Sequence, residues 1–173
     1  MGVAAALACG FVPPAPFALQ RCLARAATRA GVQAVYAADG RQIDLTISAK
    51  GVARFDAGLP PGADRIVAAL LAGRAGEALR LVGGDAERSA LVLWYGSPAL
   101  AVGIGGPREA GPRVLLDPKR FIPLGLASEG LQVRLAEVDG PLTAHGLPTV
   151  LEVQIAGLGT WTARLVGPPL RKR

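Results

Sequence analysis

The feature that most constrains the fold is a strict alternation of apolar and polar residues near the C-terminal end of the chain. The pattern starts at residues 131–136 and returns at 151–155 and 160–165. The apolar members of the three stretches are Leu131, Val133, Leu135, Leu151, Val153, Ile155, Trp161, Ala163 and Leu165. A period of two is typical of a strand with one buried and one solvated face. Three such strands in succession predict an antiparallel meander with one apolar face.

Shorter apolar stretches, separated by glycine and proline, extend this pattern towards the N-terminus. The dipeptide Asp39-Gly40 is a strong hairpin signal between two alternating segments. Residues 90–95 are apolar on both faces, which favours a central position in the sheet. Further strands are expected at 52–55, 99–105, 113–117 and 121–126.

Helical periodicity is confined to two regions. Residues 17–30 carry an apolar stripe opposite Arg21, Arg25 and Arg29, which we expect on one solvated face. This helix packs against the sheet or, alternatively, touches a membrane. Residues 63–72, with Asp64 as a cap, and residues 75–82 predict two more helices. The expected class is α+β.

The length of 173 residues suits a single domain that buries a core. Since 51% of residues are hydrophobic and only 5% aromatic, this core is expected to be aliphatic. Residues 1–18 are small, apolar and proline-rich, as in a secretory-signal remnant or an irregular arm. We therefore expect one domain over 19–170 and a basic tail over 171–173.

The net charge of +6 does not indicate nucleic-acid binding. Half of it comes from the tail Arg171-Lys172-Arg173, and basic residues are not interleaved with aromatic ones. A solvated face and a soluble tail explain the charge, and attraction to anionic lipid headgroups is a secondary expectation.

The chain has two cysteines and one histidine, too few for a zinc site at any usual spacing. In an exported chain, Cys9 and Cys22 can form a disulfide. Alternatively, the phrase Ala6-Leu-Ala-Cys9 resembles a lipoprotein lipobox, in which Cys9 is lipidated. His145 stands alone in a loop, and we expect no metal and no cofactor.

No arrangement of residues predicts catalysis. The glycines at 103–106 lie between strands and lack the spacing of a dinucleotide fingerprint. Asp117 and Asp139 stand at turns, where aspartate commonly accepts hydrogen bonds from backbone amides. We therefore expect a protein that is not an enzyme.

The order of phrases from 91 to 166 resembles the outer-membrane lipoprotein-sorting (LolA/LolB-like) superfamily of bacterial envelope proteins. The phrases are AVGIGG at 101–106, RVLLDPKRFIPL at 113–124, GLPTVLEV at 146–153 and WTARL at 161–165. The resemblance implies a curved antiparallel half-barrel of about seven to nine strands, covered by two or three helices. It also implies a periplasmic location, or one at the inner face of the outer membrane.

The resemblance further implies that the apolar concave face binds acyl chains of lipids or lipoproteins. The residues expected on that face are Leu91, Leu93, Leu131, Val133, Leu135, Leu151, Val153, Ile155 and Trp161. The alternative is a structural or interaction module of the envelope, with envelope proteins as partners, whose core is filled and holds no ligand. An open apolar cavity distinguishes the first hypothesis from the second.

Overall fold

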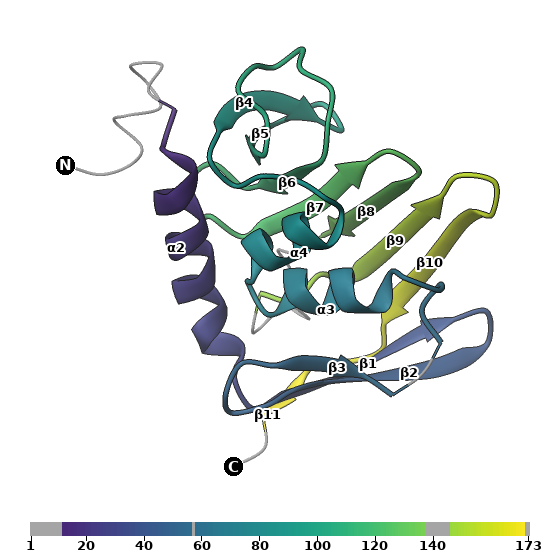
Figure 1. Cartoon of the computed structure of the whole chain (residues 1–173). Helices are drawn as coiled ribbons and strands as arrows, with labels where there is room; N and C mark the ends of the chain where they lie inside the picture. Colours follow the sequence, from purple (N-terminus) through teal and green to yellow (C-terminus); the bar gives the residue numbers. More distant parts are fainter. Residues whose placement is uncertain (1–11, 57, 138–145, 172–173) are drawn as a thin grey trace.

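The computed structural model describes residues 12–56, 58–137 and 146–171. Within these residues, eleven antiparallel strands form one open, curved sheet, and three α-helices lie against it (Figure 1). This confirms the predicted α+β class and the helix-covered antiparallel sheet. The strand number exceeds the expected seven to nine. Strand β3 (Ala53–Phe55) lies within the strand expected at 52–55, whereas β11 (Leu170–Arg171) is too short to show a periodicity and was not expected.

The sheet follows the chain order except at one place. Its order is β3-β2-β1-β10-β9-β8-β7-β6-β5-β4, and β11 pairs with β1. The N-terminal hairpin therefore joins the meander through the pairing of β1 with β10. The remaining strands are β1 (Val32–Ala38), β2 (Arg41–Ile47), β4 (Ser89–Trp94), β5 (Ser97–Val102), β6 (Arg113–Leu116), β7 (Pro123–Ser128), β8 (Leu131–Ala136), β9 (Val150–Ile155) and β10 (Gly159–Leu165).

The strand register places apolar residues in continuous rows across the concave face. One row crosses six strands from β10 to β5 and consists of Trp161, Val153, Val133, Leu126, Val114 and Val102. All of them except Trp161 are fully buried. Because side chains alternate across a strand, this register sends the polar residues of the same strands to the convex face.

The helices begin and end close to, but not at, the predicted residues. Helix α2 (Ala15–Ala26) starts two residues before the predicted position and passes into a 3₁₀ turn, η1 (Ala27–Arg29). A proline in its first turn explains the early start, because proline is pre-shaped for that position. Helix α3 (Asp64–Leu71) has Ala63 as its N-cap, so Asp64 is the first helical residue and not the predicted cap.

Helices α3 and α4 (Ala75–Leu81) cover the concave face of the sheet, and α2 lies along one end of it (Figure 1). Helix α3 buries Ile66, Val67 and Leu70 against the sheet residues in one large apolar core. The glycine between α3 and α4 permits a tight contact with α2. A Cβ atom on Gly73 would lie only 2.3 Å from the Cβ of Ala26.

The prediction that residues 90–95 form a central strand is wrong, because β4 ends the sheet and pairs only with β5. The reason is a second, smaller core on the other face. Leu91 packs against the main core, whereas Val92 and Trp94 pack with a small cluster of buried residues. That cluster contains Ala90, Ala99, Ala101, Ile104, Leu115 and Ala127. An edge strand between two cores is apolar on both faces, like a central one.

Candidate binding site at the open end of the sheet

The two ends of the curved sheet differ. At one end lie the turns of the β1–β2, β7–β8 and β9–β10 hairpins, and at the other end lies α2 (Figure 1). We call the hairpin end the mouth, defined by the half-buried apolar residues Leu131, Ile155 and Trp161 of β8, β9 and β10. Leu131 and Ile155 stand opposite each other in the register.

The nine residues predicted on the apolar face fall into three groups. Val133, Leu135, Leu151 and Val153 are at most 4% exposed beneath the helices. Leu91 and the three mouth residues are partly buried and pack against the same core. Leu93, at 76% exposure, lies apart near the end of β4. The structure therefore brings eight of the nine to one core and leaves Leu93 outside it.

A groove of about 890 Å³ opens at the mouth. Its apolar wall comes from Leu131 and from Ile66, Leu81 and Val82 of α3 and the end of α4. The rest of the lining comes from residues 110–113 and from the β7–β8 hairpin, including Arg113, Glu129, Ser128 and Gln132. Ligand sites usually have volumes of roughly 300–1,000 Å³, so this groove is large enough for a small amphiphile.

A second hollow of about 360 Å³ lies between the β1–β2 hairpin and β10. Trp161 and Ile43 supply apolar surface, and Arg41 and Asp39 supply charge. Gly58, from the segment that leads to α3, completes the lining. This hollow extends the accessible apolar surface of the mouth as far as the first hairpin.

The opposite end contains a buried arginine that the sequence analysis placed in solvent. Arg29 is only 3% exposed, the single buried polar or charged residue among those described. Its Nη1 donates a hydrogen bond of 2.8 Å to the carbonyl oxygen of Leu71, the last residue of α3. Burial lowers the pKa of Arg29 from its ordinary value.

The spacing of the three arginines explains the error. Four residues turn an α-helix by about 400°, or about 40° beyond one full turn. Arg21 and Arg25 lie within α2 and remain exposed, whereas Arg29 lies beyond α2, at the end of the tighter 3₁₀ turn η1, and points to the buried side. A missed signal was available, since Arg29 also falls at the end of the helix, where the chain must turn into β1.

Two further titratable groups are buried near this end. The hydroxyl of Tyr36 donates a hydrogen bond of 2.8 Å to the carbonyl oxygen of Pro148. Burial raises the pKa of this hydroxyl, and burial also raises the pKa of the Cys22 thiol to about 11. Both groups are therefore neutral at physiological pH. Their buried positions indicate a role in packing the end of the sheet beside α2, which we call the closed end.

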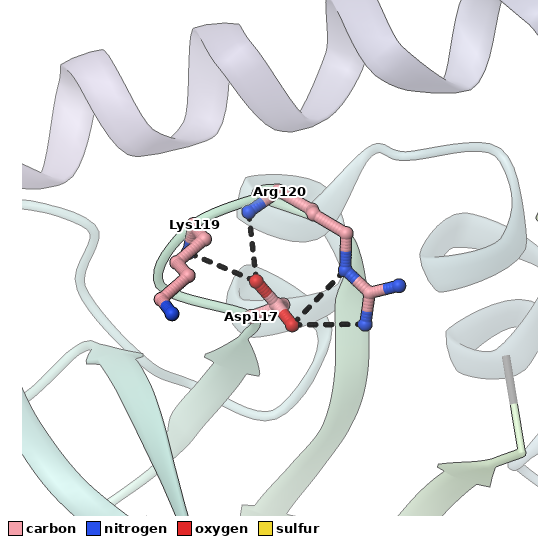
Figure 2. Close-up of polar contacts among 3 residues, drawn as sticks. All are labelled: Asp117, Lys119 and Arg120. Atoms are coloured by element: carbon pink, nitrogen blue, oxygen red, sulfur yellow. Dashed lines mark hydrogen bonds and ion pairs between the residues drawn. The ribbon is translucent and has the colours of Figure 1, made fainter. Parts of the chain in front are cut away.

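Asp117 belongs to a self-contained turn between β6 and β7 (Figure 2). Its Oδ1 accepts hydrogen bonds from the backbone nitrogens of Lys119 and Arg120, and its Oδ2 accepts two from the Arg120 guanidinium. Burial alone would raise the pKa of Asp117, but the hydrogen bonds from Arg120 and Lys119 hold it below its ordinary value. The prediction that Asp117 binds backbone amides is confirmed, and its oxygens are all engaged.

This turn also anchors α2. Phe121 adopts a positive φ of 56° directly after the aspartate-centred turn. Its ring meets Phe17 of α2 edge-on, with centroids 5.8 Å apart. Residues 117–121, which belong to one of the phrases that carry the family resemblance, therefore connect the sheet to α2.

Several predictions concern residues outside the described part of the chain. Cys9, Asp139 and His145 belong to this group, so the disulfide and the lipidation of Cys9 stay predictions. Cys22 itself is buried and free. Over 12–56, 58–137 and 146–171, His, Cys, Asp and Glu form no group of three or more able to hold a metal ion. The helices of this part are too short or too polar to cross a membrane.

Comparison with known protein families, with curated proteins and with solved structures gave no match to this chain. The class is therefore defined by the fold itself, an open, curved antiparallel sheet with helices on its concave face. The helical side of the mouth, Ile66 and Leu81, and its charged rim residue Arg113 were not singled out by the strand pattern.

Proposed function

We propose that this protein binds acyl chains of lipids or lipoproteins at the mouth, without catalysing a reaction, in the envelope of a bacterium. The observation that carries this proposal is the position of Leu131, Ile155 and Trp161. These side chains continue the buried apolar rows of the concave face to a point where they are half exposed. An acyl chain laid against them removes apolar surface from water, at about 25 cal/mol per Å².

The polar rim of the groove supports an amphiphilic ligand over a purely apolar one. Arg113 and Glu129 line the same groove as Leu131 and Leu81, so one wall is charged and the other apolar. A headgroup or acylated peptide would contact the polar side while the chain contacts the other. The proposed location, the periplasm or the inner face of the outer membrane, rests on the family resemblance and on the presence of such lipids there.

Entry beyond the mouth requires movement of the covering helices. Val133 and Val153 are fully buried beneath α3 and α4, so the interior is occupied by side chains of the protein. A chain that inserts deeper would replace the apolar side chains of α3, chiefly Ile66, Val67 and Leu70. In this exchange the acyl chain takes over the apolar contacts that the α3 side chains make with the sheet, so the apolar surface of the sheet stays buried.

The second candidate function is a structural or interaction module with a filled core and no ligand. The observation in its favour is the complete burial of Val133, Leu135, Leu151 and Val153. In this case the groove at the mouth is a surface feature, and envelope proteins are the partners. The two candidates differ in whether the purified protein carries or takes up lipid.

The test is native mass spectrometry of the protein purified from a bacterial periplasm, followed by organic extraction and by uptake of a fluorescent fatty acid. Leu131→Glu and Ile155→Glu each place a charge on the half-buried mouth, and circular dichroism and thermal unfolding check that each variant is folded. Leu170→Glu makes the same change at a site that is 69% exposed on β11, away from the mouth.

We expect a co-purifying phospholipid or acylated peptide, and fatty-acid uptake that falls at least about tenfold in the two mouth variants. Leu170→Glu should retain uptake. A lipid-free mass together with no uptake by the unmodified protein would leave the filled module as the better account. Equal uptake by all three variants would show that the fatty acid does not bind at the mouth.

A further inference from the structure

The outer side of α2 is unusually apolar and basic for an exposed helix. The helix buries Ala15, Ala18, Cys22 and Ala26, packs Leu19 partly against the main core, and exposes most of its other residues. The ring of Phe17 also contacts Phe121 along one edge. Two large apolar side chains lie on that surface, Phe17 at 41% exposure and Leu23 at 53%. The described segment from 12 to 34 contains no acidic residue.

The exposed residues of α2 are ordered around its axis. At 100° per residue, Phe17, Gln20 and Ala24 fall in the middle of the exposed arc. Arg21 and Arg25 fall on one margin, and Leu23 falls on the other. The guanidinium of Arg21 lies 5.9 Å from the centre of the Phe17 ring. One margin of the apolar strip is therefore basic.

The other margin is also basic, through residues from other elements. A groove of about 490 Å³ runs beside Leu23 and Ala27, and its far wall contains Lys50 and Arg74. None of the residues that line it is acidic. Glu77 lies 3.7 Å from Arg74 and offsets part of its charge, whereas Lys50 has no such neighbour in the described chain. Cations thus flank an apolar strip on both sides.

This arrangement suits a surface that is negatively charged outside and apolar just beneath. Helices with an apolar strip between basic margins lie in the headgroup region of a bilayer, where the basic residues are attracted to anionic lipid. We propose that the outer side of α2, together with Lys50 and Arg74, docks onto the surface of an anionic lipid bilayer. Among the described helices and strands, none lies beyond α2 at this end of the sheet in Figure 1.

The docking surface is separate from the mouth, which lies at the opposite end of the sheet (Figure 1). The proposal therefore does not depend on acyl-chain binding, and each can fail without the other. The measurement is co-sedimentation of the full chain with phosphatidylcholine vesicles, with and without phosphatidylglycerol, at low and at physiological salt.

The test pair is Arg21→Glu with Arg25→Glu, two exposed positions with no ion pair among the described residues. The matched control is Arg54→Glu with Arg164→Glu, two exposed arginines on β3 and β10. Both double variants change the net charge equally, so a difference between them reports the position of the charges. A third variant, Leu23→Gln, tests the apolar part of the surface.

We expect the unmodified chain to bind vesicles that contain phosphatidylglycerol, with weaker binding as salt increases. Binding should fall at least about tenfold in the α2 pair, at most about threefold in the control pair, and measurably in Leu23→Gln at physiological salt. Equal losses in both pairs would show that binding depends only on the net charge of the protein, and would overturn the proposal. Absence of binding to any vesicle would also overturn it and would leave an acidic protein as the remaining kind of partner.

Discussion

Arg29 donates a hydrogen bond of 2.8 Å from Nη1 to the carbonyl oxygen of Leu71, 42 residues further along the chain. Leu71 ends α3, so a buried cation stands at the negative end of the helix that covers the concave face. The bond joins the α2–η1 segment at the closed end to the helical cover of the sheet. It is the one place where the described core contains a charge.

Replacing Arg29 by alanine should lower the free energy of unfolding by about 2–4 kcal/mol, because it removes a buried hydrogen bond and leaves a cavity. Arg25→Ala, on the exposed side of the preceding helix α2, should change it by less than about 0.5 kcal/mol. Urea denaturation of the two variants at neutral pH checks this. Losses of equal size would show that Arg29 contributes no more than a surface arginine.

Cys22 should make the protein less stable in alkali. Burial raises the pKa of its thiol to about 11 from 9.0, so the folded state holds the proton more tightly than the unfolded state does. The contribution is complete below pH 9.0 and is lost as the pH rises towards about 11. Thermal unfolding between these values should show a fall that is smaller in Cys22→Ala.

The same burial should protect the Cys22 thiol from alkylation in the native protein. Iodoacetamide at mildly alkaline pH should modify the peptide that contains Cys22 only after unfolding, since the thiolate is the reactive form. Peptide mapping by mass spectrometry distinguishes this cysteine from Cys9. Rapid modification in the folded protein would contradict the buried position.

Gly125→Ala should be strongly destabilising, by about 2–3 kcal/mol or more. A Cβ atom at this position would lie 2.2 Å from the carbonyl oxygen of Val133 and 3.2 Å from the Trp94 ring, which packs over the strand. Gly106→Ala is the matched control, since no atom lies within 4 Å of the Cβ it would add. The comparison requires only the urea midpoints of the two variants, and similar midpoints would refute the close approach.

Asp117 should stabilise the fold in neutral solution and less so in acid. Its pKa is held below the ordinary value by hydrogen bonds from Arg120 and Lys119, so the carboxylate favours the folded state above that value. This contribution disappears as the pH falls through the lowered pKa. In Asp117→Asn, stability at pH 7 should therefore be lower and the decrease on acidification shallower. Denaturation curves at several pH values measure both.

The fold class was predictable because it depends on local repetition. The alternation at 131–136, 151–155 and 160–165 requires a strand with one buried face, whatever lies above it. The turn Asp39-Gly40 likewise set the first hairpin, and both of its residues adopt a positive φ. In contrast, the pairing of β1 with β10 closes a distance of more than a hundred residues and has no local signature.

The candidate site was predictable only on its sheet side. The period of two identified Leu131, Ile155 and Trp161, but it did not separate these half-buried residues from the fully buried Val133 and Val153. That difference depends on where α3 and α4 end above the strands. Leu93 shows the same limit, since its alternation resembles that of Leu91 although only Leu91 is covered.

Local sequence was thus sufficient for the strands, the helices and the apolar face, because backbone periodicity and turn chemistry act over a few residues. Long-range packing was required to bury Arg29, to place β4 at an edge between two cores, and to leave α2 exposed on a basic and apolar side. Burial is a property of the neighbours that a residue acquires from distant parts of the chain. The same arginine spacing therefore produced two surface cations and one buried one.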